Sequence, residues 1–197
     1  FAERAFSLGY IDTNEALTKD IVKKKIKRLQ NGENKWGILQ AEVYSEGILE
    51  ASIMNGFPEF IATCHKSGIN VSIISYKTKF NAHDLLQRDL KQAAQNWMQT
   101  NQFFDSRVFG FNLNQIFFAD SIEEKISTIE NQQCTHFIDD LLSILLHPAF
   151  PENTCKILYW PYSFKKRHEA MHYSGNWWEI RKYLLQDLYF IFFKAQS

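Results

Sequence analysis

Apolar and polar residues alternate with a helical period through the first third of the chain. Residues 12–29 and 36–53 each place their apolar side chains on one face of a helix, and Thr18 is a candidate N-cap. A Gly and a Pro at residues 56–58 interrupt this pattern before a further helix that ends near Gly68. The pattern predicts a helical N-terminal part.

After Gly68 the pattern changes to short β-branched or aromatic runs that alternate with helical segments. The predicted strands cover residues 69–75, 115–119, 135–139 and 156–160, and the predicted helices cover residues 85–100, 122–132 and 177–188. Strands that alternate with helices of this length favour an α/β fold, with a parallel sheet covered by helices on both faces. We expect residues 1–53 to form a small helical cap and residues 54–197 to form the α/β core.

Composition narrows the class of protein. With 197 residues and 45% hydrophobic content, the chain can bury one substantial core. The 22 basic and 22 acidic residues cancel, so no overall field favours nucleic acid or an anionic membrane as partner. Three cysteines in apolar runs indicate free thiols in a reducing compartment, and we expect a cytoplasmic location. No run has the length of a membrane span or the pattern of a signal peptide, and the oligomeric state stays open.

Two adjacent carboxylates end the predicted strand at residues 135–139. The run from Cys134 to Asp140 is β-prone and finishes on Asp139 and Asp140. The carboxyl ends of parallel strands are the usual ligand position in open α/β folds. Neighbouring carboxylates raise one another's pKa unless a cation shares them, and Mg²⁺ suits such oxygen ligands. The pair therefore predicts a Mg²⁺ site.

Two further predicted elements carry residues suited to a phosphate group. Ser75 ends the first predicted strand, where its hydroxyl can either bind a phosphate oxygen or cap the following turn. Lys77 follows closely enough to reach the same phosphate or else lies on the surface. Lys125 lies within the first two turns of the helix that precedes the acid pair, fourteen residues before Asp139, where it either neutralises a phosphate or is a solvated lysine. One helix and one loop of that length return the chain to the same edge of a parallel sheet.

These residues, in this order, resemble the second, third and fourth motifs of the haloacid dehalogenase-like (HAD) superfamily, whose members are mostly Mg²⁺-dependent phosphatases. More narrowly, the chain looks like a little-characterised bacterial group of HAD-like hydrolases, and the resemblance extends from residue 39 to about Trp160. The segments that carry it are residues 39–44, 73–78, 124–126 and 134–140.

The resemblance implies a Rossmann-like three-layer fold with a small helical cap near the N-terminus. It implies that Ser75 hydrogen-bonds the transferring phosphoryl group, that Lys125 balances charge, and that Asp139 or Asp140 holds Mg²⁺. The substrate would be a small phosphorylated molecule. In the cap, readable ligand chemistry is confined to Gln40, Glu42 and Tyr44.

The first motif of the superfamily, an apolar strand that ends in Asp-x-Asp and supplies the nucleophile, has no counterpart in the chain. Asp12 is the sole early candidate, but Asn14 occupies the position of the second aspartate. We expect residues 1–6 to belong to the helix after that motif, so that the first core strand lies upstream of Phe1. Without the nucleophile, the remaining residues bind metal or phosphate but do not cleave. The alternative is a non-catalytic phosphate- or partner-binding module of the same fold.

A second metal motif competes with this interpretation. His168, Glu169 and His172 match the H-E-x-x-H pattern of zinc metalloproteases, in which a helix places both imidazoles on one face. However, Trp178 stands where a third histidine is expected, and a basic segment at residues 165–167 precedes the motif. A polar loop that leads into the last helix is favoured here. The basic residues within 19–28 are likewise favoured as a solvated helix face rather than a nucleic-acid contact.

Overall fold

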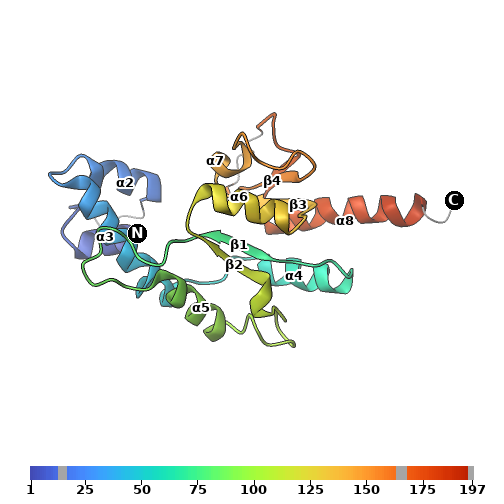
Figure 1. The fold of residues 1–197 in the computed structure, drawn as a ribbon, viewed down its shortest axis with the longest axis horizontal. Helices are drawn as coiled ribbons and strands as arrows, with labels where there is room; N and C mark the ends of the chain where they lie inside the picture. The colour runs from blue at the N-terminus through green and yellow to red at the C-terminus, as the bar shows by residue number, and fades with distance from the viewer. Residues whose placement is uncertain (13–16, 163–167, 195–197) are drawn as a thin grey trace. The chain divides into compact units, whose positions relative to one another are not determined.

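The computed structural model describes residues 1–12, 17–162 and 168–194, and the chain divides into two compact units (Figure 1). Unit 1 comprises residues 1–52 and 77–102, and unit 2 comprises residues 53–76 and 103–197. The first division falls between residues 52 and 53, one residue before the expected end of the cap. The expectation that everything after it forms the core differs from the structure, because residues 77–102 belong to unit 1.

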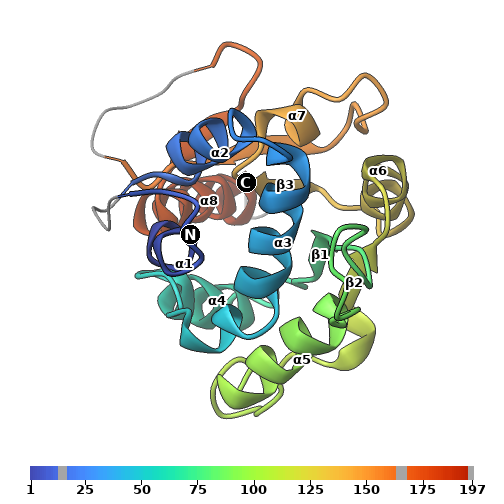
Figure 2. The same ribbon diagram turned by 90° about the vertical axis from the view of Figure 1, so that its left-hand side faces the viewer.

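Unit 1 is helical in its described part. Its elements are α1 (Ala2–Ser7), α2 (Lys19–Lys27), α3 (Gly32–Tyr44), the 3-10 helix η1 (Gly47–Glu50) and α5 (Leu90–Thr100). Figure 2 shows α1, α2 and α3 grouped together, and the apolar faces of α2 and α3 meet around Val22, Ile26 and Leu39, which are fully buried. The Thr18 hydroxyl accepts a hydrogen bond from the Ile21 amide, which confirms the predicted N-cap of α2.

Long-range contacts attach residues 77–102 to unit 1. The indole Nε1 of Trp97 donates to the carbonyl of Ala51 at 2.8 Å. Gly37 on α3 lies so close to His83 that an added Cβ would meet the imidazole at 2.6 Å. These contacts join segments far apart in the sequence, so local patterns could not predict them. The expected helix 85–100 begins later, at Leu90, where the side chain of Asp89 accepts from the Gln92 amide and caps it.

Unit 2 is an α/β unit with parallel strands. Its strands are β1 (Ile73–Tyr76), β2 (Ile116–Ala119), β3 (His136–Asp139), β4 (Cys155–Tyr159) and β5 (Tyr173–Gly175). Its helices are α4 (Phe57–Lys66), the 3-10 helix η2 (Leu113–Gln115), α6 (Ile122–Asn131), α7 (Leu142–Leu145) and α8 (Trp177–Lys194). The predicted α/β class and parallel pairing are confirmed at this level.

The strands form two sheets rather than the single sheet expected. β1 pairs with β2, and β3, β4 and β5 pair in that order. One hydrophobic core nevertheless underlies both sheets: it contains Ile74 of β1, Phe137 of β3, and Ile126 and Ile129 of α6. Within the described residues, no strand pairs with the second edge of β1 or with the second edge of β3. Both open edges therefore border the same core.

Several predicted elements differ in their ends. The strand expected over residues 69–75 is confined to β1, and the helix expected over residues 36–53 ends at Tyr44, after which η1 forms. β5 and α7 are additional elements.

The predicted free thiols are confirmed: Cys64 is buried, and Cys134 and Cys155 are half-buried. Burial raises the pKa of Cys64 to about 11.

Among the helices of the described residues, none has the length and apolar character needed to cross a membrane.

Candidate functional site at the carboxyl end of β3

A buried ion pair lies where β3 ends. The Nζ of Lys125 is 2.5 Å from Oδ2 of Asp139, and the two side chains are 8% and 6% exposed. Lys125 also lies over the ring of Phe137, with Nζ 5.4 Å from the ring centroid. Lys125 and Asp139 therefore meet at one edge of the sheet, as their fourteen-residue spacing predicts.

Local sequence explains why Lys125 reaches this position. Ser121 caps α6 through a hydrogen bond from the Glu124 amide to its hydroxyl at 3.0 Å, and the Glu124 carboxylate accepts from the Asp120 amide at 2.7 Å. These contacts start α6 directly after β2. Lys125 thus lies one turn into the helix, on the face that also buries Ile126 and Ile129.

Asp139 has both carboxylate oxygens engaged. Oδ2 accepts from Lys125, and Oδ1 accepts from the backbone amide of Leu141 at 2.9 Å. Burial raises the pKa of Asp139 above its ordinary value, and the nearby charge of Asp140 adds to this, while Lys125 and the Leu141 amide act in the opposite direction. Such a carboxylate is oriented by its neighbours and keeps few lone pairs for a further ligand.

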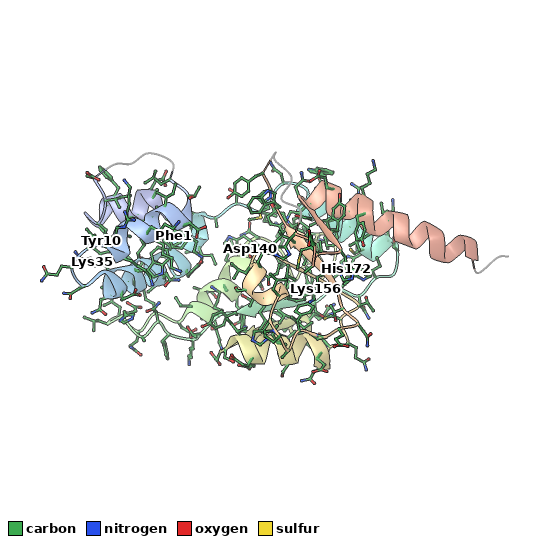
Figure 3. The ribbon with its side chains drawn as sticks, turned by 90° about the horizontal axis from the view of Figure 1, so that it is seen from above. Phe1, Tyr10, Lys35, Asp140, Lys156 and His172 are labelled. Atoms are coloured by element: carbon green, nitrogen blue, oxygen red, sulfur yellow. The ribbon has the colours of Figure 1, made fainter. Side chains whose placement is uncertain are left out.

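Asp140 differs from Asp139 in its exposure and in its contacts with other residues. It is exposed, and its carboxylate makes no hydrogen bond or salt bridge with a described residue. Figure 3 labels its position in unit 2. After burial, the charge of Asp140 is the next cause that raises the pKa of Tyr159 on the neighbouring strand β4. Asp140 therefore directs negative charge over the carboxyl ends of β3 and β4.

Ser75 lies on β1, paired in register with Phe118 of β2. It is half-buried, and its hydroxyl has no hydrogen-bond partner among the described residues. Because successive side chains of a strand alternate between faces, Ser75 points away from the face that buries Ile74. The strand continues to Tyr76, so Ser75 is its penultimate residue rather than its last.

The remaining expected ligand residues, Gln40, Glu42, Tyr44 and Lys77, belong to unit 1. Gln40 is half-buried on α3. Glu42 lies 3.8 Å from Arg4 and 3.9 Å from Arg88, so its carboxylate is already neutralised. Tyr44 and Lys77 contact each other, with Nζ of Lys77 4.6 Å from the ring centroid of Tyr44. The structure therefore brings together Lys125 with Asp139 in unit 2, and Tyr44 with Lys77 in unit 1.

The zinc-binding pattern lacks the helix that it requires. Residues 168–172 form a turn that leads into β5, and the Nδ1 atom of each histidine accepts a hydrogen bond from a backbone amide. His168 accepts from the Ala170 amide at 3.3 Å, and His172 accepts from the Lys156 amide at 3.0 Å (Figure 3). The favoured alternative is confirmed: the segment is a non-helical connection, and the last helix starts at Trp177. The basic residues 165–167 lie outside the described residues.

The early acid Asp12 is exposed and lies in a bend of unit 1, so it does not end a strand, and Asn14 lies outside the described residues. In the described part of the chain, no three His, Cys, Asp or Glu side chains gather closely enough to hold a metal ion. Mg²⁺ often binds proteins through one or two carboxylates and takes its other ligands from water and phosphate. Asp140, with Asp139 beside it, suits binding through one or two carboxylates and does not suit a site that takes all its ligands from the protein.

Comparisons of the chain with protein-family models, with curated proteins and with solved structures found no match.

Two ionic contacts were not anticipated from the sequence. The buried carboxylate of Asp84 accepts from the guanidinium of Arg88 at 3.0 Å, and its only sequence signal was an acid four residues before a base. In addition, Lys19 donates to the Tyr44 hydroxyl at 2.8 Å. Lys19 had been grouped with a solvated basic face, and no local pattern connects it with a residue twenty-five positions away.

Proposed function

We propose that unit 2 is the core of a HAD-like, Mg²⁺-dependent phosphomonoester hydrolase. The observation that carries the proposal is the buried Lys125–Asp139 pair at the carboxyl end of a parallel strand. Burying two charges in this way is costly, and hydrophobic residues of similar volume would stabilise a core as well or better. Stability alone therefore does not explain a buried ammonium at the usual ligand edge of an α/β sheet. Binding of a negatively charged substrate at this edge explains it better.

The residue types suit phosphoryl transfer, which depends on positioning and charge neutralisation. Asp139 holds Lys125 in place, so that the ammonium can offset the negative charge of a phosphoryl group. Asp140, exposed and without a protein partner in the described residues, is the direct ligand in our proposal, and Asp139 positions it. The bound Mg²⁺ would supply further neutralisation of phosphate charge. The hydroxyl of Ser75 would donate a hydrogen bond to a phosphate oxygen.

The substrate in this proposal is a small phosphorylated molecule, and unit 1 corresponds to the helical cap that the resemblance implies. Gln40, Glu42, Tyr44 and Lys77 are the residues of unit 1 to which we assign substrate contacts. Three free cysteines suit a reducing compartment, and we propose a cytoplasmic location.

The nucleophile is the part that the described residues do not supply. β1 and β3 each have an open edge among the described strands and each contribute to one core, which suits the addition of one more parallel strand. We propose that such a strand carries the nucleophilic aspartate, and that the present chain binds Mg²⁺ and phosphate without cleaving an ester. The second candidate is a non-catalytic binding module of the same fold. If no strand with a nucleophile exists, the buried Lys125–Asp139 pair favours this module.

The test is hydrolysis of a generic phosphomonoester by the protein as its gene encodes it, including any residues that precede Phe1. We expect activity that requires Mg²⁺ and that falls at least about 100-fold in Asp140→Asn, as for other groups that stabilise transition-state charge. Asp120→Asn is the matched control, since Asp120 is an exposed acid at the end of β2. Full Mg²⁺-dependent activity in Asp140→Asn together with Asp139→Asn would refute the metal assignment. Phosphate binding without any hydrolysis would favour the binding module.

A further inference from the structure

Two lysines of unit 1 converge on one tyrosine. The Nζ of Lys19 donates to the Tyr44 hydroxyl at 2.8 Å and lies 5.4 Å from the centroid of its ring. The Nζ of Lys77 lies 4.6 Å from the same centroid. Lys19 begins α2, Tyr44 ends α3, and Lys77 follows β1 in the sequence, so three separate segments build this group.

Neither ammonium group has a countercharge within residues 1–12, 17–162 and 168–194. Among the described residues, no carboxylate forms a salt bridge with Lys19 or Lys77. The nearby acid on α3, Glu42, is engaged by Arg4 and Arg88 instead. Two like charges held around one ring repel each other, and an anion between them would remove that repulsion.

The placement of Lys19 adds to this excess of positive charge. It is the first residue of α2, where the amides of the first turn and the helix dipole already favour anions and disfavour cations. Burial lowers the pKa of Lys77 below its ordinary value, and the charge of Lys19 lowers it further. The helix dipole at Lys19 and the neighbouring ammonium of Lys77 therefore both favour an anion at this place.

Polar groups suited to hold an anion surround the lysines. The Tyr44 hydroxyl accepts from Lys19 and can donate its own proton to a ligand oxygen. Gln40 is half-buried one helical turn before Tyr44, so its amide lies on the same face of α3. The ring of Phe1 also lies beside this group, with its centroid 5.2 Å from Nζ of Lys19 and 5.6 Å from the centroid of the Tyr44 ring.

We propose that Lys19, Lys77 and Tyr44 form an anion-binding site for a doubly charged phosphate group. The inference shares Tyr44 and Lys77 with the substrate contacts of the proposed function, but it is argued from contacts within unit 1 alone and requires no hydrolysis. Two ammonium groups match the charge of a phosphate dianion, and the phenol and amide provide directional hydrogen bonds to its oxygens.

Simple packing of a lysine on an aromatic ring is the competing explanation, and the same unit provides the reference for it. Lys35 lies over Tyr10 with Nζ 5.6 Å from the ring centroid (Figure 3), but no second ammonium group lies on that ring. Packing alone predicts that both lysine–tyrosine contacts respond equally to added anions. A phosphate site predicts that only the group with two lysines responds.

The experiment is an NMR titration of the full 197-residue chain with inorganic phosphate at constant ionic strength, reading the Cε–Hε signals of the lysines. We expect saturable shifts for Lys19 and Lys77 and none for Lys35. Lys77→Met should weaken phosphate affinity at least ten-fold, Lys77→Arg should retain it, and Lys35→Met should leave it unchanged. The retained affinity of Lys77→Arg separates loss of charge from misfolding.

Two results would overturn the proposal. One is a linear, non-saturating response of Lys19 and Lys77 no larger than that of Lys35. The other is equal phosphate affinity in Lys77→Met and Lys35→Met. Because the readout is confined to lysines of unit 1, a negative result removes the substrate contacts assigned to Tyr44 and Lys77 and leaves the proposed Mg²⁺ site of unit 2 standing. A failed hydrolase assay leaves the unit 1 site standing.

Discussion

The Nζ of Lys125 and Oδ2 of Asp139 are 2.5 Å apart although the residues are fourteen positions apart in the chain, and both side chains are almost entirely buried. The contact ties α6 to the end of β3 across the core that both sheets share. It is therefore a constraint on the fold of unit 2 as well as the centre of the candidate site.

Removal of one partner of this pair should destabilise the protein strongly. Lys125→Met leaves the Asp139 carboxylate buried without its countercharge, and we expect the free energy of unfolding to fall by about 3–5 kcal/mol. The double variant Lys125→Met with Asp139→Asn should lose less than the sum of the two single variants, because the unpaired charge is gone. Urea unfolding of the four proteins measures this coupling. Strictly additive losses would show that the two side chains do not stabilise each other.

The Asp84–Arg88 pair should make part of the stability depend on pH. Burial acts to raise the pKa of Asp84, but hydrogen bonds from the Arg88 amide and guanidinium and from the Leu86 amide outweigh it and lower that pKa below the ordinary 3.8. At pH values near these two pKa values, Asp84 therefore binds fewer protons in the native state than in the unfolded state. The stabilisation that Asp84 contributes is fully present above pH 3.8. It is lost as the pH falls through the lowered pKa of the native state.

We therefore expect Asp84→Asn to reduce the free energy of unfolding by about 3 kcal/mol near pH 7, since it removes the nearest carboxylate from Arg88 and leaves only Glu42 and Glu46 at 3.9 Å. The difference between the two proteins should stay constant down to about pH 4 and shrink below it. Urea unfolding at several pH values measures this. A difference that widens on acidification would contradict the assigned direction of the pKa shift.

Much of the fold was predictable where local patterns are strong. The ends of β2, β3 and α6 lie within one residue of those expected, because β-branched and aromatic runs alternate there with a capped amphipathic helix. β5 was missed because Tyr173, Ser174 and Gly175 have no apolar alternation. The membership of residues 77–102 in unit 1 was missed because it depends on long-range contacts such as that between Gly37 and His83.

The candidate site was predictable in part for the same reason. Strand ends and a helix start are local features, so the meeting of Lys125 and Asp139 could be expected from spacing. The different surroundings of Asp139 and Asp140 could not be predicted, because burial and partners depend on how α6 and β3 pack. Lys19 was missed because its contact with Tyr44 depends on the packing of α2 against α3.

The open edges of β1 and β3 should be visible in hydrogen exchange. β4 lies between β3 and β5, so its amides have partners on both sides, while alternate amides of β1 and β3 point to edges that have no strand partner in the described residues. We expect those alternate amides to exchange roughly ten-fold or more faster than the amides of β4. Equal protection of all three strands would mean that another segment already occupies the edges.

The most direct test of the central claim, a Mg²⁺ site at the carboxyl end of β3, is paramagnetic line broadening by Mn²⁺ as a substitute for Mg²⁺ in the presence of inorganic phosphate. Both cations prefer carboxylate and phosphate oxygens. We predict broadening that centres on Asp140 and Leu141, that excess Mg²⁺ reverses, and that Asp140→Asn abolishes while Asp120→Asn does not. Broadening centred elsewhere, or unchanged in Asp140→Asn, would contradict the account.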